Sequence, residues 1–525
     1  MICSLPAAAR LALLVLALAL AAHGALPLDR YAGTVKEFQL ANGLKIILIE
    51  DHASPVVTAC FTARGGYADD PQGMRGLASL VPALLEQGPE QLGSKNLVQE
   101  RAAIKEMNAA YAQLRALDLK PGSSALYDRM RAEARFKLAI RVAESLGKPQ
   151  FSARALDLHG AQSFRAVATA DHIQWSVRLP SNRIDAFLLL YGEWLRLPFP
   201  RFISGNKERR AQEFAQSQAS PDAALRRTVL SLAFGPAGYG LMDWEPSEMD
   251  RVQYVEVESY LKSRLVATNL VLTLAGDLTL ESARALAEKY LAKIPAGSPA
   301  ALALPKPPEL AELRAPPPKE APGAILVGYR RPPESDPDDP VMDVIEQTLL
   351  EGANGRFRNE FLAANPMLAR FIPIASLPGA RQGGLMAAIV AHHPAKTPNE
   401  WSRLIAEFFE SAANQPMDAA TIAAAQRMLE SRLLSVLADP FLAAQHVGRM
   451  GGWAKTAALP QAWALVTPQE VQRVAAKYLR PELRVILQPG FVTPPAGTRA
   501  PATPPATPPP AGAKPTTPPV AEVPK

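Results

Sequence analysis

The chain reads Gly76-Leu77-Ala78-Ser79-Leu80-Val81-Pro82-Ala83-Leu84 directly after two apolar segments. The large apolar residues of this stretch recur at spacings of three and four, which predicts an amphipathic helix with one buried face. The two preceding segments, residues 43–50 and 56–63, have the apolar character of strands, and Asn42-Gly43 predicts a hairpin turn before them. The order of turn, strands and helix therefore predicts an α+β fold at the start of the chain.

Length and composition predict a globular protein with more than one core. The chain has 525 residues, of which 48% are hydrophobic and 20% are charged, and its net charge is +6. Chains longer than about 250–300 residues usually divide into several domains. Because the Lys and Arg residues are scattered along the chain, its charge does not indicate a nucleic-acid-binding surface.

The N-terminus has the pattern of a secretory signal peptide. Arg10 precedes an apolar run over residues 11–22, and Ala22-His23-Gly24 offers a small-x-small cleavage site. The run is too short for a stable membrane span, so we predict a signal peptide over residues 1–24 and a periplasmic or otherwise exported protein. An uncleaved N-terminal anchor is the alternative. The mature chain would keep one cysteine, Cys60, and therefore no internal disulfide.

Two proline-rich stretches divide the mature chain. Residues 295–322 contain nine prolines and are interpreted as an interdomain linker, and residues 489–525 contain thirteen and are predicted to be a disordered or extended tail. These boundaries leave an N-terminal lobe over residues 25–294 and a C-terminal lobe over residues 323–488. A charged, Ala-rich stretch at residues 98–147 predicts a helical insertion in the first lobe, and a solvated surface role is favoured over a partner-binding role.

The ends of the two lobes repeat one pattern. Residues 257–274 read as a helix followed by an apolar strand, and residues 471–487 read the same way. Each copy ends shortly before proline-rich sequence. The repeat predicts an α+β fold with two related lobes, each a mainly antiparallel sheet with helices packed on one face.

The helix that begins at Gly76 resembles the first helix of the pitrilysin/insulinase metallopeptidase family, which reads G-x-A-H-x-x-E-H. In that family the two His bind zinc and the Glu is the general base. The matching positions here hold Ser79, Pro82 and Ala83. Ser is a poor zinc ligand and Ala has no ligand atom, while Pro removes a helix hydrogen bond at a cost of ~3 kcal/mol. The resemblance thus implies the family fold, in which two lobes form half of a clamshell, without its metal ligands.

The other functional positions of the family also fall on unsuitable residues. The third zinc ligand of the family is a Glu on a later helix, seven residues after another recurring Glu. If Glu208 takes the first place, the ligand position holds Ala215, and Glu213 would lie about 200° around the helix from it. The resemblance further places the family's substrate-contacting Arg and Tyr at Leu362 and Ala369. It therefore implies no catalytic residue and no metal ligand in this chain.

One segment of the resemblance concerns peptide binding. Arg165-Ala166-Val167-Ala168 resembles the N-A-x-T edge strand of the family, against which substrate peptides pair in extended form. Only Ala166 matches the family pattern. The resemblance implies that Arg165, Ala166, Val167 and Ala168 bind peptide by adding a strand to the sheet.

These observations lead to a hypothesis about function. The chain is expected to be a catalytically inactive subunit that pairs with an active zinc peptidase of the same family and helps to enclose peptides or unfolded polypeptide. No cofactor is expected in the chain itself, and zinc is expected only in the partner subunit. A stand-alone peptide-binding or scaffold protein is the alternative, and an active zinc endopeptidase with a misaligned site is a third reading. The sequence does not distinguish a homo-oligomer from a hetero-oligomer.

Overall fold

The computed structural model describes residues 28, 31, 33–118, 123–241, 244–298, 311–351, 355–368 and 370–491. The chain separates into a unit over residues 1–491 and a unit over residues 492–525, and all described residues belong to the first. The expected signal peptide and residues 492–525 of the expected tail lie outside the described residues. None of the described helices combines the length and the apolar character that a bilayer crossing requires.

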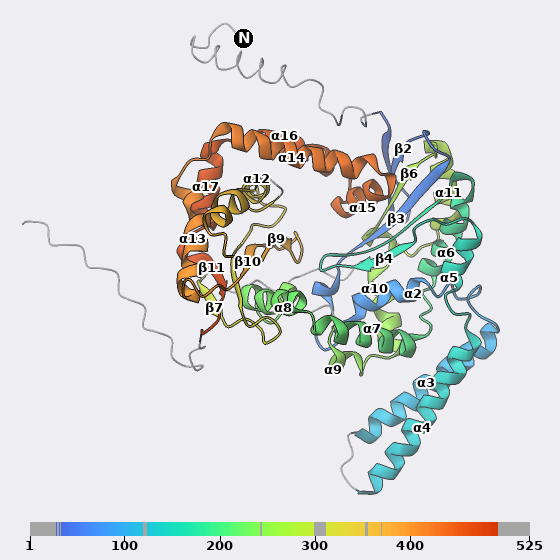
Figure 1. Cartoon of the computed structure of the whole chain (residues 1–525). Helices are drawn as coiled ribbons and strands as arrows, with labels where there is room; N and C mark the ends of the chain where they lie inside the picture. The colour runs from blue at the N-terminus through green and yellow to red at the C-terminus, as the bar shows by residue number, and fades with distance from the viewer. Residues whose placement is uncertain are drawn as a thin grey trace, which may run out of the picture. The chain divides into compact units, whose positions relative to one another are not determined.

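The N-terminal lobe is built on a six-stranded sheet (Figure 1). Its strand order is β1-β2-β6-β3-β5-β4, and all neighbours are antiparallel except β2 and β6. Successive side chains of each strand point to opposite faces of the sheet, and both faces are apolar, as a sheet buried on both sides requires. Their bounds are β1 Val35–Gln39, β2 Lys45–Glu50, β3 Val56–Arg64, β4 Arg165–Ala168, β5 His172–Pro180 and β6 Leu270–Gly276.

Ten α-helices accompany this sheet in the described part of the lobe. Helices α2, α6, α10 and α11 contribute to the core on one face of the sheet, which contains Trp175 and Trp194. The bounds are α2 Leu77–Leu85, α3 Leu97–Asp118, α4 Ser123–Leu146, α5 Phe151–Leu158, α6 Ile184–Arg196, α7 Ile203–Gln218, α8 Pro221–Phe234, α9 Pro246–Met249, α10 Tyr254–Arg264 and α11 Leu280–Leu291.

The C-terminal lobe is built on a five-stranded sheet of order β7-β11-β8-β10-β9. Its strands are β7 Leu313–Ala315, β8 Ala324–Arg330, β9 Phe371–Leu377, β10 Leu385–Ala391 and β11 Arg484–Leu487. Its helical segments are α12 Asp339–Leu349, the π-helical η6 Phe357–Leu362, α13 Pro398–Asn414, α14 Ala419–Ala438, α15 Pro440–Met450, α16 Trp453–Ala464 and α17 Pro468–Tyr478.

The two sheets repeat one topology, which confirms the prediction of two related α+β lobes. In the first lobe β6 lies parallel to β2 and antiparallel to β3, followed outward by β5 and β4. In the second, β11 lies parallel to β7 and antiparallel to β8, followed outward by β10 and β9. Strands β6 and β11 come from the sequence repeat, and β4 and β9 are equivalent edge strands.

Each sheet also takes a helix from the other lobe on its second face, which the sequence did not predict. Helix α15 of the C-terminal lobe packs on β3 and β6, and Ala444 and Val447 share a core with Ile47 and Val271 of the first sheet. Helix α8 of the N-terminal lobe packs against β7 and β11, where Val229 joins the apolar residues of the second sheet. The helices on one face were predicted correctly, and the reciprocal helices cover the opposite faces.

The approach of α15 to the first sheet is close and partly polar. The Gln174 amide donates to the backbone oxygen of Gln445 over 2.8 Å, and the Gln445 amide donates to Ser176 Oγ over 2.8 Å. A Cβ atom at Gly448 would lie 2.6 Å from Thr62 Oγ1. Because such a contact is too short for a side chain, glycine at this position permits the helix to reach the sheet.

Residues 295–322 are not a linker along their whole length, so the sequence interpretation was wrong for one segment. Leu313–Ala315 forms β7, which pairs with β11 in parallel register. The prolines at 316–318 follow the strand, and β7 lies at the edge of its sheet, where proline neighbours remove no ladder bond. Residues 299–310 lie outside the described residues, and the other domain boundaries remain predictions.

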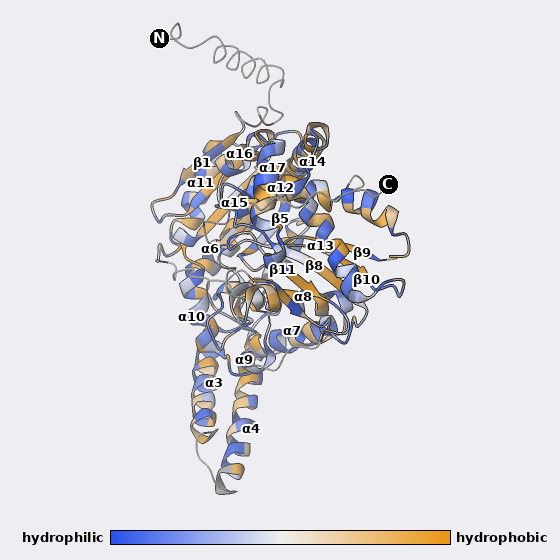
Figure 2. Cartoon of the chain, turned by 90° about the vertical axis from the view of Figure 1, so that its left-hand side faces the viewer, coloured by the Kyte–Doolittle hydropathy of each residue, from blue (hydrophilic) through white to orange (hydrophobic). Residues whose placement is uncertain are grey.

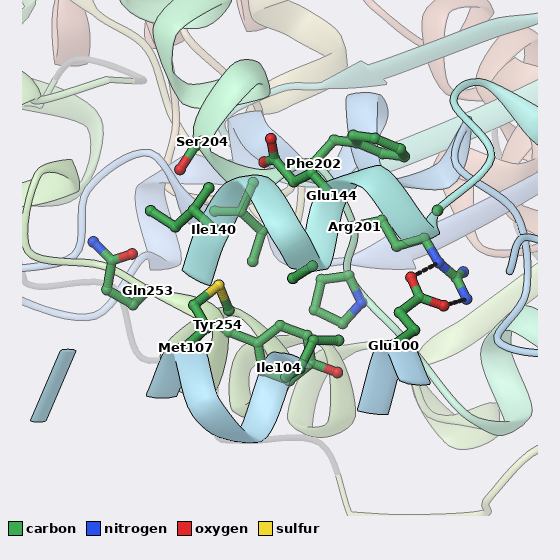
Figure 3. A pocket seen from close by; sticks show the side chains of 14 residues that line it. Glu100, Ile104, Met107, Ile140, Glu144, Arg201, Phe202, Ser204, Gln253 and Tyr254 are labelled. Atoms are coloured by element: carbon green, nitrogen blue, oxygen red, sulfur yellow. Dashed lines mark hydrogen bonds and ion pairs between the residues drawn. The ribbon is translucent and has the colours of Figure 1, made fainter. Parts of the chain in front are cut away.

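The charged stretch after α2 forms the paired helices α3 and α4, which lie side by side in Figure 1. Their root is held by Arg201, whose guanidinium binds the Glu100 carboxylate with Nε–Oε1 at 2.7 Å and Nη2–Oε2 at 3.0 Å. Both side chains are 2% exposed. They border a cavity of about 30 Å³, which is room for one water molecule (Figure 3).

Candidate functional site

Helix α2 begins at a buried, acid-capped turn. Gly76 has φ +123°, a conformation that favours glycine, and directs its N–H to Asp70 Oδ2 over 2.8 Å. The N–H of Ala78 donates to Asp70 Oδ1 over 3.0 Å, so one carboxyl group satisfies two amides that the helix leaves free. Burial raises the pKa of Asp70 to about 7 against the opposing effect of these two hydrogen bonds.

Ser79, Pro82 and Ala83 lie half-buried on one side of α2, away from the buried Leu80 and Leu84. The Ser79 hydroxyl is shielded from solvent and has no hydrogen-bond partner among the described residues. A hydroxyl, a pyrrolidine ring and a methyl group do not provide the imidazole and carboxylate donors of a catalytic zinc site. This side of α2 therefore does not fit a metal ion.

Helix α7 packs against α2, but its acidic residues do not face that helix. Ala211 and Phe214 of α7 pack on the core that contains α2, whereas Glu208, Glu213 and Ala215 are exposed. The Glu213 carboxylate pairs with the Arg210 guanidinium along the helix at 3.4 Å. Glu208 and Glu213 thus lie on a solvated face of α7.

Of the two positions expected to match the substrate-contacting Arg and Tyr, the structure describes only the first. Leu362 ends η6 and packs half-buried against the core of the C-terminal lobe, while Ala369 lies outside the described residues. The neighbouring cations are engaged elsewhere. The Arg358 guanidinium lies over the Phe371 ring at 5.5 Å, and Arg370 pairs with Asp222 at 2.6 Å.

Metal-binding groups are not assembled elsewhere in the described part of the chain. Among its residues, no three His, Cys, Asp or Glu side chains are placed so that they could hold a metal ion. His172, the first residue of β5, instead makes a 3.0 Å contact from Nδ1 to Thr169 Oγ1.

The segment Arg165–Ala168 is β4, an edge strand that pairs only with β5. The N–H of Thr169 donates to the carbonyl of His172, so every second residue before Thr169 also bonds to β5. These residues are Val167 and Arg165. The N–H and C=O groups of Ala166 and Ala168 point to the free edge instead. Within the described structure these outward groups have no hydrogen-bond partner. The edge can therefore accept an extended peptide.

Strand β4 lies beside α2, so the free edge and the side that lacks metal ligands belong to one site. Ala166 and Ala168 turn toward the core that α2 contributes to. The equivalent edge of the C-terminal lobe differs, because Pro373 lies in β9 and is paired with Ala388. The N–H of Arg331 donates to the carbonyl of Gly384, so every second residue of β10 from Gly384 onward, including Ala388, bonds to β8. The backbone nitrogen of Pro373, the partner of Ala388, therefore points to the free edge of β9, where proline has no N–H to donate.

A polar latch beside the β4–β5 turn was not predicted. The Tyr239 hydroxyl donates to Asp171 Oδ1 over 2.5 Å, and the N–H of Ala380 donates to Asp171 Oδ2 over 2.8 Å. The Arg381 guanidinium binds Asp69 Oδ2 at 2.6 Å. These residues lie far apart in the chain, and no local pattern in the sequence marks them. The latch joins the loop before β10 to the end of the hairpin that carries β4.

Comparison with known proteins bears on this site. Residues 251–429 match the family model described as the peptidase M16 inactive domain. No curated protein sequence matches the chain significantly.

Solved structures show the same fold at low sequence identity. A protease from Helicobacter pylori superposes with a TM-score of 0.69 at 13% identity, covering 86% of this chain and 98% of that one. A peptidase M16 inactive domain from Pseudomonas fluorescens gives 0.65 at 16% identity, covering 88% and 99%. A chain of Complex III2 from Candida albicans, with Inz-5 bound, gives 0.63 at 11% identity, covering 87% and 95%.

Proposed function

We propose that this protein is a non-catalytic subunit that pairs with an active zinc peptidase of the M16 family, because residues 251–429 match the model of the peptidase M16 inactive domain. In this proposal the chain holds no metal of its own, and zinc resides in the partner. Its role is to help enclose peptides or unfolded polypeptide. The pattern at residues 1–24 supports a periplasmic or otherwise exported location.

The observation that carries the proposal is the free edge of β4 beside α2. Two outward residues, Ala166 and Ala168, offer donors and acceptors to an extended chain, and Ser79, Pro82 and Ala83 provide no metal ligands next to them. A site that can align a peptide but has no group to activate water suits a binding subunit. A fold relative within Complex III2 supports the idea that this fold works inside larger assemblies.

Purification of the tagged chain from its native cells tests the pairing. We expect an M16-type zinc peptidase to co-purify, with zinc in the complex and chelator-sensitive cleavage of unfolded polypeptide only when the partner is present. Stoichiometric zinc and chelator-sensitive cleavage in the isolated chain would contradict the proposal and support the third reading. A chain that binds peptide but has no peptidase partner would support the stand-alone reading.

Replacing Ala168 by Pro is expected to weaken peptide binding about tenfold, since one outward N–H donor is lost. Fluorescence anisotropy with an unfolded, labelled peptide measures this change. The stability of the variant should stay near that of the wild type because the lost N–H does not bond to β5.

Val167→Pro is the matched control for the opposite side of the same strand. Its N–H faces β5, so this change should lower the melting temperature. Equal peptide affinity in the Ala168→Pro variant and the wild type would show that peptides do not pair at this edge.

A further inference from the structure

The two sides of the edge strand β4 have different surroundings. Ala166 is paired with Trp175 of β5, which belongs to the core that α2 contributes to. Arg165 is paired with Ser176, whose Oγ accepts from the Gln445 amide of α15, the helix beside β5 in Figure 2. Because paired residues point to the same face of a sheet, Ala166 points to the α2 side and Arg165 to the α15 side. A peptide extended along this edge would direct its alternate side chains to these same two sides.

The α2 side carries one carboxylate that lacks a cation. Glu86 ends α2 seven residues after Ser79, so helical geometry places it on the side of α2 that lacks metal ligands. Its side chain is half-buried, and its carboxylate makes no hydrogen bond or ion pair with any described residue. Burial raises the pKa of this carboxyl, and the more distant Arg209 cation opposes the shift. A cation supplied from outside the chain would therefore stabilise this charge.

The neighbours of Glu86 place it toward the start of β4. Burial, and then the charge of Glu86, raise the pKa of the Tyr191 hydroxyl, so the two groups lie within electrostatic reach. The Tyr191 ring stacks on the Phe164 ring, with centroids 6.3 Å apart and planes inclined by 3°. Phe164 directly precedes β4, and α2 packs against this strand. Glu86 thus lies near the end of the free edge at which Arg165 begins the strand.

The α15 side carries one cation that lacks a carboxylate. Arg165 is exposed, and its guanidinium has no hydrogen-bonding or ionic partner in the described part of the chain. Arg178 of β5 points to the same face of the sheet, but Asp439 compensates its charge at 2.7 Å. The two sides of the edge therefore present opposite charges, Glu86 on one and Arg165 on the other, which are not paired within the described structure.

We propose that this edge selects extended peptides in which basic and acidic residues alternate. A basic side chain on the α2 side pairs with Glu86, and an acidic neighbour on the α15 side pairs with Arg165. Because an extended chain reverses its side-chain direction at each residue, adjacent residues of opposite charge satisfy both sides in one register. This selectivity rests on the proposed function, since it requires peptides to pair with β4, and it adds the class of peptide that is bound.

Two labelled peptides of the same composition test the selectivity. In one peptide Lys and Glu alternate, and in the other they form Lys-Lys and Glu-Glu pairs, so that each side of the extended peptide carries both charges. At low ionic strength, fluorescence anisotropy should show about fivefold tighter binding of the alternating peptide, as exposed ion pairs permit. Added salt should reduce this difference because it screens exposed charges.

Charge reversal in the chain separates local pairing from net charge. Glu86→Lys makes both sides positive and should abolish the preference, and the isosteric Glu86→Gln should reduce it. Glu86→Lys combined with Arg165→Glu again gives the two sides opposite charges, which the alternating peptide meets by slipping one residue, so the preference should return. The matched control is Glu288→Lys, at an exposed position of α11, which changes the net charge equally and should keep the wild-type preference. Equal melting temperatures report intact folding.

The outcomes distinguish this selectivity from the edge itself. Equal binding of both peptides by the wild type, while Ala168→Pro still weakens both, would overturn the charge selectivity and leave the peptide edge in place. A preference that persists undiminished in Glu86→Gln and Glu86→Lys would overturn the role of this carboxylate. If Ala168→Pro alters the binding of neither peptide, β4 is not the peptide site and both proposals fail.

Discussion

Replacing Arg201 by Ala is expected to lower the free energy of unfolding by about 3–5 kcal/mol, because it leaves the Glu100 carboxylate buried without its cation. Arg201 also donates to the backbone oxygens of Gly88 and Glu90, at 3.1 and 2.5 Å. One side chain thus joins the root of α3 to the loop after α2 and to the segment after α6. Urea unfolding monitored by circular dichroism measures the change.

Two further variants make this result specific. Arg403→Ala breaks an exposed i, i+4 pair with Glu407, whose side chains are 58% and 48% exposed, and should cost about 0.5 kcal/mol or less. Arg201→Met combined with Glu100→Leu removes both charges and should recover much of the loss, because no unpaired ion remains. A single Arg201→Ala variant within about 1 kcal/mol of the wild type would contradict the role assigned to this pair.

Acidification from pH 6.5 to 4 is expected to destabilise the packing of α15 on the first sheet. Burial, reinforced by the Arg449 cation, lowers the pKa of both His172 and His446 to about 4, although Asp171 opposes the shift at His172. The unfolded chain protonates these residues near pH 6.5, whereas the folded chain keeps them neutral. The unfolded state therefore binds more protons as the pH falls, and stability decreases by up to about 3 kcal/mol per histidine.

The pH dependence of urea unfolding measures this loss. The His172→Gln/His446→Gln variant should lose less stability than the wild type between pH 6.5 and 4, whatever its stability at neutral pH. His159→Gln changes an exposed histidine and should keep the wild-type slope. Equal slopes in the double variant and the wild type would show that these two histidines do not control acid unfolding.

Local apolar patterns in the sequence predicted the helices and strands that pack within their own lobe. The apolar spacing from Leu77 to Leu85 defined α2, and the helix–strand repeat located β6 and β11. Helix α8, β7 and β9 were missed. The short β7 is stabilised by a distant partner strand, and α8 finds its apolar partners in the other lobe, so their own sequences carry weak signals.

The candidate site was predictable only where it depends on residue type. Ser79, Pro82 and Ala83 have side chains that are not typical zinc ligands, and the resemblance placed residues 165–168 in an edge strand before its register was known. The latch around Asp171 and Arg381 was not predictable, since the bonds from Ala380 and Arg381 to Asp171 join residues more than 200 positions apart. The missing N–H donor at the outer edge of β9 was also not predictable. Whether the backbone nitrogen of Pro373 points outward depends on the strand register, which only the pairing of β8, β9 and β10 establishes.

The reciprocal placement of α8 and α15 has a consequence for how the two repeated halves can exist. An isolated half would expose one apolar face of its sheet, because the helix that covers this face belongs to the other half. A chain broken within residues 299–310 would still contain both missing helices, so separately produced fragments could reconstitute each other. The two halves are therefore expected to be stable only together, because each completes the core of the other.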